Sequence, residues 1–268
     1  MKRPRRRLKA LPINRMIPNM LTMLALCAGM TAIQFGLQDR WEHAVIAIAV
    51  AAILDGLDGR IARMLKGASK FGAELDSLSD FICFGVAPAM MLYLWSMQEA
   101  GRFGWLLVLL YAVCCALRLA RFNTALEDVE APAWAKNFFS GVPAPAAGGL
   151  VLLPIILSFQ LGDSIVRRPE MVAFFLIAVA ALMVSRIPTY AFKADKIPHR
   201  WVLPMMLLVG LLAASIVSAP WITLSVVLVV YSISIPFSVR AYRRLEDGTD
   251  TEDPDDDDEA DDEENQIA

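Results

Sequence analysis

The sequence predicts an all-α membrane protein, a polytopic bundle of about eight transmembrane helices with both termini in the cytoplasm. Hydrophobic residues make up 57% of the 268-residue chain, above the roughly 45–50% of soluble domains. Mean hydropathy is +0.50. Eight apolar runs are each close to the ~20 residues that an α-helix needs to cross hydrocarbon. Lys and Arg are also distributed unevenly between these runs.

The first 17 residues form a basic arm. They contain seven Lys or Arg residues, a pattern typical of a cytoplasmic segment that faces anionic lipid headgroups. The apolar run that follows has the length of a span and lacks a convincing small-residue cleavage site. We therefore expect this first span to be retained and not removed as a signal peptide.

The apolar runs define a membrane domain predicted over residues 18–245. They occupy 18–37, 43–62, 75–97, 103–120, 145–161, 170–187, 202–218 and 220–237. With the N-terminus inside, 21 of the 25 Lys and Arg residues fall in the predicted cytoplasmic segments. Because cytoplasmic loops of membrane proteins are enriched in these residues, the asymmetry places both termini in the cytoplasm.

The last segment, residues 246–268, is predicted to be a disordered acidic tail. It holds 14 of the 28 Asp and Glu residues and has almost no hydrophobic residues, so it has too little apolar surface to bury. Without this tail the chain has a net charge of +11. A basic membrane domain suits anionic lipid headgroups, and we expect membrane lipid and no nucleic acid among its partners.

Four aspartates interrupt the apolar sequence at the end of the second run and the start of the third. Asp55 and Asp58 are spaced i, i+3, and Asp76 and Asp80 are spaced i, i+4, so on helices each pair shares one face. A carboxylate bordering hydrocarbon costs about 3 kcal/mol unless a partner or an ion compensates it. Two such pairs brought together offer the oxygen ligands that Mg²⁺ and Mn²⁺ prefer. The sequence therefore predicts a divalent metal site at the cytoplasmic rim.

Small residues and one arginine lie between the aspartates. Gly59 and Gly72 lack a Cβ atom and would let a phosphate or base approach the backbone. The alternative is that they allow helices to pack closely in the membrane. Ala62 leaves room beside Arg63, whose planar guanidinium suits a phosphate group.

The spacing of these residues resembles the signature of the CDP-alcohol phosphotransferase family. That signature, D-x2-D-G-x2-A-R-x8-G-x3-D-x3-D, is matched at every fixed position. The resemblance implies an enzyme that transfers a substituted phosphate group from a CDP-linked donor and releases CMP, with two Mg²⁺ or Mn²⁺ ions. It also implies that Asp55, Asp58 and Asp76 are metal ligands, and that Asp80 is both a ligand and the general base.

The resemblance further implies a site for the CDP group that includes the cytoplasmic end of the first span. Its residues would be Asn19, Thr22, Asp58, Gly59, Ala62, Arg63 and Gly72. Asn19 and Thr22 are spaced i, i+3 and would face the nucleotide. The alternative is that Asn19 caps a helix and that the Thr22 hydroxyl is satisfied by the backbone.

Two downstream segments bear on the acceptor alcohol. Residues 118–123, RLARFN, and 139–147, FSGVPAPAA, resemble patterns of the integral-membrane bacterial phosphatidylserine synthases within this family. The resemblance implies CDP-diacylglycerol as donor, L-serine as acceptor, a homodimer, and a place in the bacterial inner membrane with the active site facing the cytoplasm. Arg118 and Arg121 would bind the serine carboxylate and Asn123 would offer a donor and an acceptor. Alternatively, the arginines only anchor the span at the headgroup level.

Other functions remain open at this point. A different acceptor, such as glycerol 3-phosphate, would make the protein a phosphatidylglycerophosphate synthase, and its phosphate would also need arginines. A cation transporter is a second alternative, because intramembrane aspartates carry ions in such proteins. We expect direct displacement at phosphorus, although Ser77 and Ser79 leave a covalent intermediate possible.

Overall fold

The computed structural model describes residues 13–65, 69–125, 138–185, 187–190 and 199–249. In chain order the elements are α1 (Ile13–Leu37), α2 (Trp41–Met64), α3 (Lys70–Asp80), the π-helix η1 (Phe81–Val86), α4 (Ala87–Trp95), the 3-10 helix η2 (Met97–Ala100), α5 (Gly101–Ala125), β1 (Phe138–Ser140), α6 (Ala144–Val151), α7 (Leu153–Leu161), α8 (Asp163–Val166), α9 (Pro169–Val184), β2 (Pro188–Tyr190), α10 (His199–Ser218) and α11 (Pro220–Thr249).

Each apolar run predicted to span the membrane coincides over most of its length with helices of the structure. Five helical segments are long and apolar enough to cross a membrane: Met16–Leu37, Lys70–Trp95, Met97–Thr124, Ala144–Leu161 and Pro220–Arg240. The apolar parts of α9 and α10 are shorter, and the 24-residue α2 carries charged residues in its last turns. The prediction of a helical membrane protein is therefore confirmed, while the number of spans and their orientation stay predictions.

A short pair of strands departs from the all-α prediction. β1 and β2 pair antiparallel, with Phe138 opposite Tyr190 and Ser140 opposite Pro188. The strands are only three residues long, so the hydropathy pattern did not predict them. They join the segment that precedes α6 to the segment that follows α9.

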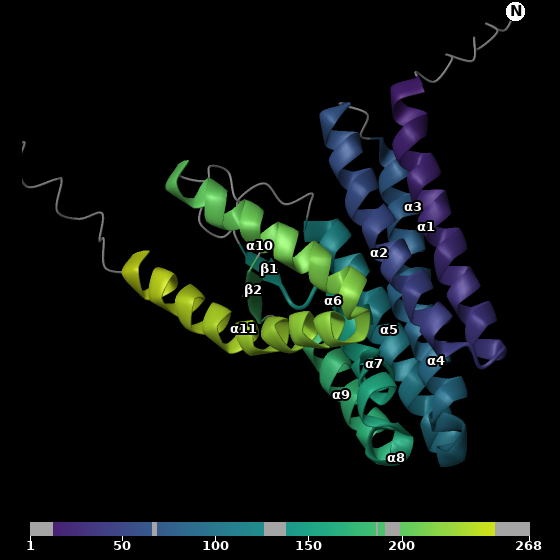
Figure 1. The fold of residues 1–268 in the computed structure, drawn as a ribbon. Coiled ribbons are helices and arrows are strands. Elements are labelled where there is room, and N and C mark those ends of the chain that lie inside the picture. The colour runs from purple at the N-terminus through teal and green to yellow at the C-terminus, as the bar shows by residue number, and fades with distance from the viewer. Residues whose placement is uncertain (1–12, 66–68, 126–137, 186, 191–198, 250–268) are drawn as a thin grey trace, which may run out of the picture.

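The helices are arranged around a core between two outer groups. Figure 1 shows α1, α2 and α3 side by side on one side of the molecule, with α10 and α11 on the other. The largest fully buried side chains, which include Phe84, Trp95 and Tyr111, come mainly from the elements between these groups. Because α1, α2 and α3 lie together, the two aspartate pairs predicted from the sequence meet at one place.

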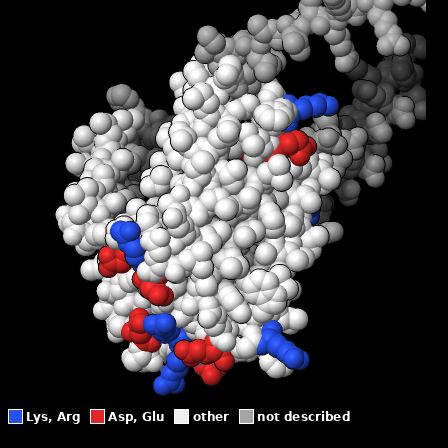
Figure 2. Space-filling view, turned by 90° about the vertical axis from the view of Figure 1, so that its right-hand side faces the viewer, with Lys and Arg blue, Asp and Glu red and all other residues white. Residues whose placement is uncertain are grey.

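The surface is apolar over much of its area. On the face shown in Figure 2, charged side chains gather toward one end, a second group lies near the other, and a broad stretch between them is largely uncharged. Many large hydrophobic side chains are exposed, for example Leu203, Leu207 and Leu211 on α10. Contiguous exposed apolar surface of this kind is rare in soluble monomers and suits contact with lipid.

The first and last helices extend past the predicted ends of the membrane domain. Helix α1 begins at Ile13, inside the predicted basic arm, and α11 continues to Thr249, past the predicted boundary at residue 246. The rest of the arm, residues 1–12, and of the acidic tail, residues 250–268, lie outside the described residues.

Candidate active site

Helices α2 and α3 bring the aspartates together. Asp55 and Asp58 lie near the end of α2, and Asp76 and Asp80 lie in α3. Helix α3 has a well-defined start, because the Ser69 side chain at its N-cap accepts a hydrogen bond of 3.0 Å from the Gly72 N–H group. An N-cap of this kind stabilises a helix by about 1 kcal/mol. It also fixes where α3 begins, and so where Asp76 and Asp80 lie along it.

Three of the four aspartates form a compact cluster. Carboxylate oxygens of Asp55, Asp76 and Asp80 all lie within 4.8 Å of one another. The Oδ1 atom of Asp80 is buried and has no hydrogen-bond partner among the described residues. Among the described residues the only ion pair joins Arg167 to Asp163, so no salt bridge neutralises the charge of the three carboxylates. Clustered carboxylate oxygens with an unsatisfied member fit a divalent cation.

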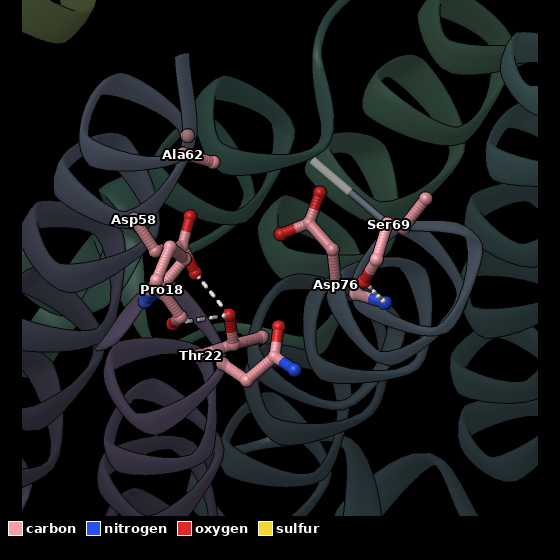
Figure 3. Close-up of a pocket in the computed structure, with 10 residues that line it drawn as sticks. Pro18, Thr22, Asp58, Ala62, Ser69 and Asp76 are labelled. Atoms are coloured by element: carbon pink, nitrogen blue, oxygen red, sulfur yellow. Dashed lines mark hydrogen bonds between the residues drawn. The ribbon is translucent and has the colours of Figure 1, made fainter. Parts of the chain in front are cut away.

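The fourth aspartate, Asp58, has a partner of its own. It is 4% exposed, and its Oδ2 atom accepts a hydrogen bond of 2.5 Å from the Thr22 hydroxyl (Figure 3). The same hydroxyl lies 3.1 Å from the Pro18 carbonyl, but a hydroxyl donates only one proton and the charged oxygen is nearer. This hydrogen bond ties α1 to α2. Whether Asp58 also binds metal stays a prediction.

A cavity of about 170 Å³ opens between α1, α2 and α3. We call it the Asn19 cavity. It is lined by Pro18, Asn19, Thr22, Asp58, Gly59, Ala62, Ser69, Gly72, Ala73 and Asp76. Six of the seven residues predicted to bind the CDP group are therefore brought together around one space. The exception is Arg63, which is exposed and donates a hydrogen bond of 3.1 Å to the Gly59 carbonyl.

The contacts of Asn19 and the two glycines resolve alternatives that the sequence left open. Asn19 lies in the interior of α1, so the helix-capping alternative is wrong. A Cβ atom on Gly72 would lie 2.9 Å from the Oδ1 atom at the end of the Asn19 side chain, so Gly72 gives this side chain room and also lines the Asn19 cavity. A Cβ atom on Gly59 would meet nothing within 4 Å. The space beside Gly59 is therefore open to a ligand.

A second cavity, of about 290 Å³, adjoins the first. We call it the Arg118 cavity. Its lining residues are Asp55, Asp58, Gly59, Ala73, Asp76, Ser77, Asp80, Arg118, Leu119, Phe122, Asn123 and Pro145. Asp58, Gly59, Ala73 and Asp76 line both cavities. The carboxylates therefore lie where the two cavities meet.

Two of the three predicted acceptor residues line the Arg118 cavity. Arg118 is 7% exposed, and its buried Nε atom has no hydrogen-bond partner among the described residues. Its guanidinium carbon lies 5.7 Å from the centre of the Phe122 ring, in the range of a cation–π contact. The Asn123 side-chain amide donates a hydrogen bond of 2.9 Å to the Ser77 hydroxyl. Both Arg118 and Asn123 thus present polar groups beside the carboxylates.

Arg121 has a different environment. Its two terminal nitrogens donate hydrogen bonds of 3.0 Å to the carbonyls of Val184 and Ser185. These carbonyls lie at the C-terminal end of α9, where the backbone lacks helical donors and a cation is favourable. Arg121 is not among the residues that line the Arg118 cavity. The structure therefore gives this side chain a role in joining α5 to α9.

The sequence interpretation did not single out several residues that line the two cavities. They include Ser69 and Ala73. Ser69 carried a usable signal, since serine is a preferred N-cap residue and a new helix was expected soon after it. Ala73 is a small apolar residue whose position depends on the packing of whole helices, so no local pattern marks it.

Comparison with known proteins gives consistent results. The model of a family described as CDP-alcohol phosphatidyltransferase matches residues 15–187, and a second, described as CDP-alcohol phosphatidyltransferase 2, matches residues 200–236. The chain is 42% identical to a Mycobacterium tuberculosis protein named CDP-diacylglycerol–serine O-phosphatidyltransferase, over 85% of this chain and 80% of the relative.

More distant relatives carry related names. A Helicobacter pylori protein of the same name is 34% identical over 83% of this chain and 91% of its own length. A protein from Methanothermobacter thermautotrophicus named archaetidylserine synthase is 34% identical over 64% of this chain and 68% of its own length. The similarity thus extends well beyond the aspartate motif.

Proposed function

The chain belongs to the CDP-alcohol phosphatidyltransferase family, and we propose that it transfers the phosphatidyl group of CDP-diacylglycerol to L-serine, giving phosphatidylserine and CMP. The relatives from Mycobacterium and Helicobacter are named for this reaction. The archaeal relative is named for a serine lipid as well. Membership of this family also argues against a cation transporter.

The observation that carries this proposal is the junction of the two cavities at the carboxylates. The Asn19 cavity is lined by six of the residues that the family resemblance assigns to the CDP group. The Arg118 cavity is lined by a buried arginine and by Asn123. A donor in the first cavity and an acceptor in the second would meet beside Asp76, which lines both.

We assign Asp55, Asp76 and Asp80 to hold Mg²⁺ or Mn²⁺, with Asp58 next to them and two ions expected from the family. When bound, divalent cations polarise the phosphoryl oxygens and offset the charge that develops on them. The spacing of the three clustered carboxylates supports this assignment. The hydrogen bond from Thr22 to Asp58 would keep Asp58 directed along the edge of the Asn19 cavity.

In the transfer step, the Asp80 carboxylate takes the proton of the serine hydroxyl, whose oxygen attacks the phosphorus nearest to diacylglycerol. The bond between that phosphorus and the oxygen of CMP breaks, and CMP leaves with the electron pair. Direct displacement is supported by the hydrogen bonds of the two candidate nucleophiles. The Ser79 hydroxyl is buried and donates to the Thr22 carbonyl at 3.2 Å. The Ser77 hydroxyl lies 3.1 Å from the Ala73 carbonyl and also contacts Asn123.

Arg118 and Asn123 are the groups that would recognise the acceptor. A guanidinium with an unsatisfied N–H suits the serine carboxylate, and the carbonyl oxygen of Asn123 suits its ammonium group. The low exposure of Arg118 would strengthen the ion pair with the substrate, because charges interact more strongly away from water. Arg118 would equally bind the phosphate of glycerol 3-phosphate, so the acceptor has to be tested directly.

We further propose that the site faces the cytoplasm at the inner membrane of a bacterium and that the protein acts as a homodimer. The orientation is supported by the excess of Lys and Arg in the segments on the same side as the aspartates. A soluble amino acid and a lipid-linked nucleotide would both reach a site at this rim. The homodimer is an expectation from the family alone.

The proposal is tested by measuring CMP release from purified protein in detergent with CDP-diacylglycerol and Mn²⁺. We expect release to require L-serine and to yield phosphatidylserine. The Asp80→Asn variant should lose the release, because an amide cannot take the proton. Release that depends on glycerol 3-phosphate and not on serine would contradict the acceptor assignment.

A further inference from the structure

A turn of π-helix follows directly on Asp80, in the middle of the apolar segment Lys70–Trp95. This turn, η1, covers Phe81–Val86, and at its end the Ala87 N–H group bonds to the Ile82 carbonyl five residues back. π-helical turns are rare and usually occur as single turns inside longer helices.

The sequence gives a physical reason for the turn. In an α-helix the Phe84 carbonyl would accept a hydrogen bond from the N–H group of residue 88. Residue 88 is proline, which has no N–H group and whose ring crowds the carbonyl four residues back. A continuous helix through this point must therefore open locally, and a π-turn is one known way to do so.

Tyr111 on α5 supplies a side-chain donor to the same carbonyl. Its hydroxyl donates a hydrogen bond of 2.9 Å to the Phe84 carbonyl. The Tyr111 side chain is 0% exposed, so no water replaces this bond if the hydroxyl is removed, and the loss of a buried hydrogen bond is costly. Tyr111 and Arg118 are seven residues apart on the same helix, which places them on one face. The bond thus links the helix of Arg118 to the turn that follows Asp80.

Three helices hold successive residues of the turn. A Cβ atom on Gly29 of α1 would lie 2.6 Å from the Cys83 sulfur. A Cβ atom on Gly148 of α6 would lie 3.2 Å from Phe84, and one on Gly85 would lie 3.0 Å from the Cys115 sulfur of α5. The turn is therefore packed on three sides without space to rotate.

The π-turn sets the direction of the aspartates. Each residue advances an α-helix by about 100°, so the presence or loss of one extra residue in the turn rotates α3 against α4 by about that angle. Helix α4 is fixed in the core by buried side chains such as Met91 and Trp95. The rotation would therefore fall on α3 and move Asp76 and Asp80 away from Asp55.

We propose that Tyr111 is a positioning residue of this enzyme: its hydrogen bond to the Phe84 carbonyl holds the π-turn that directs Asp76 and Asp80 toward Asp55. This inference rests on the proposed function for its catalytic consequence. Its geometric consequence, the closeness of the three carboxylates, is measurable as metal binding without any turnover.

The first test is Tyr111→Phe, which removes one oxygen atom and leaves the ring. We expect kcat to fall by about tenfold to a hundredfold, as for other small displacements of catalytic groups. The KM for CDP-diacylglycerol should rise as well, because Asp76 lines the Asn19 cavity and would be displaced. Mn²⁺ binding, followed by electron paramagnetic resonance, should weaken by at least about tenfold.

A matched control is Tyr93→Phe on α4. The Tyr93 ring packs edge-on against Trp105 with centroids 5.1 Å apart, a contact that needs no hydroxyl. This variant should bind Mn²⁺ and turn over as the wild type does. If Tyr111→Phe lowers only the thermal midpoint and keeps wild-type kcat and Mn²⁺ affinity, Tyr111 is merely structural and the proposal is wrong.

The second test adds Pro88→Ala to Tyr111→Phe. Residue 88 then offers an N–H group to the Phe84 carbonyl, so the double variant should regain thermal stability and remain foldable even if the single variant is not. We expect its Mn²⁺ affinity and kcat to stay low, because the helix can now close to α-helical geometry. Recovery of thermal stability, Mn²⁺ affinity and kcat together would overturn the positioning role.

The two hypotheses fail in different ways. A wild-type protein that binds Mn²⁺ but transfers the phosphatidyl group to no acceptor would contradict the proposed function. The comparison of Mn²⁺ binding between Tyr111→Phe and Tyr93→Phe would still decide the positioning role of Tyr111.

Discussion

Gly56 and Gly59 allow a matched pair of alanine variants that tests whether the space beside Gly59 holds the donor. Both lie in α2, and at both an added Cβ atom would meet nothing within 4 Å. They differ in one respect: Gly59 lines both the Asn19 and the Arg118 cavities, whereas Gly56 lines neither. An alanine at either position fits the protein, but only alanine at residue 59 extends into the space that we propose for the donor.

The expected changes in stability and in kcat/KM follow from the surroundings of the two added methyl groups. Replacing glycine by alanine inside a helix favours the folded state by about 0.5–1 kcal/mol where the methyl group has room. For a chain of this size that corresponds to a rise of roughly 1–4 °C in thermal midpoint. Both variants should therefore be at least as stable as the wild type. A methyl group that intrudes on a bound substrate costs about 1–3 kcal/mol, or roughly 10- to 200-fold in kcat/KM.

The assay combines thermal unfolding in detergent with steady-state CMP release at varied CDP-diacylglycerol. We expect Gly59→Ala to unfold at the wild-type temperature or above while its kcat/KM for the donor falls at least about tenfold. Gly56→Ala should keep wild-type kinetics. If Gly59→Ala is fully active, or if Gly56→Ala is equally impaired, the placement of the donor beside Gly59 is refuted.

Three further predictions concern the cluster and the arginines. Removal of divalent metal by a chelator should abolish CMP release, and either Mg²⁺ or Mn²⁺ should restore it, whereas restoration by neither would contradict the metal assignment. Arg118→Ala should raise the KM for serine by about tenfold or more, the cost of losing a charged hydrogen bond, and an unchanged KM would exclude its contact with serine. Arg121→Ala should lower the thermal midpoint by about 2–8 °C, since it loses hydrogen bonds to Val184 and Ser185, while the serine KM of the folded protein stays near wild type. An unchanged midpoint with a raised serine KM would return Arg121 to the acceptor site.

The local patterns of the sequence were sufficient for the helices and for many of the residues that line the Asn19 cavity. Hydropathy located the apolar runs, and the spacing of Asp55, Asp58, Asp76 and Asp80 placed each pair on one helix face. The Asn19 cavity then follows from packing α1 against α2 and α3. These features depend on helical periodicity, which a single sequence displays directly.

Features that depend on contacts between distant segments could not be predicted in this way. Arg121 looked equivalent to Arg118, but it bonds to the end of α9, more than sixty residues later. The partner of Arg121 is set by how α5 and α9 pack together, which the identity of neighbouring residues does not reveal. Arg63 instead donates locally to the Gly59 carbonyl, and its contact with phosphate stays a prediction.

The π-turn is an intermediate case. Pro88 is a visible signal that the third apolar run cannot be a regular α-helix throughout. The way in which the irregularity is resolved depends on Tyr111, which belongs to the next run. The proline excludes a regular α-helix at this point, and the packing of α5 shows that the chain continues through a π-turn.

The central claim is that the clustered carboxylates hold a metal ion against the diphosphate of the donor at the junction of the two cavities. Electron–nuclear double resonance of the Mn²⁺-loaded protein with bound CDP-diacylglycerol tests it most directly. We predict a phosphorus-31 coupling to Mn²⁺ that appears with the donor and is lost in Asp76→Asn. A donor that binds without any phosphorus coupling to the metal would contradict the account.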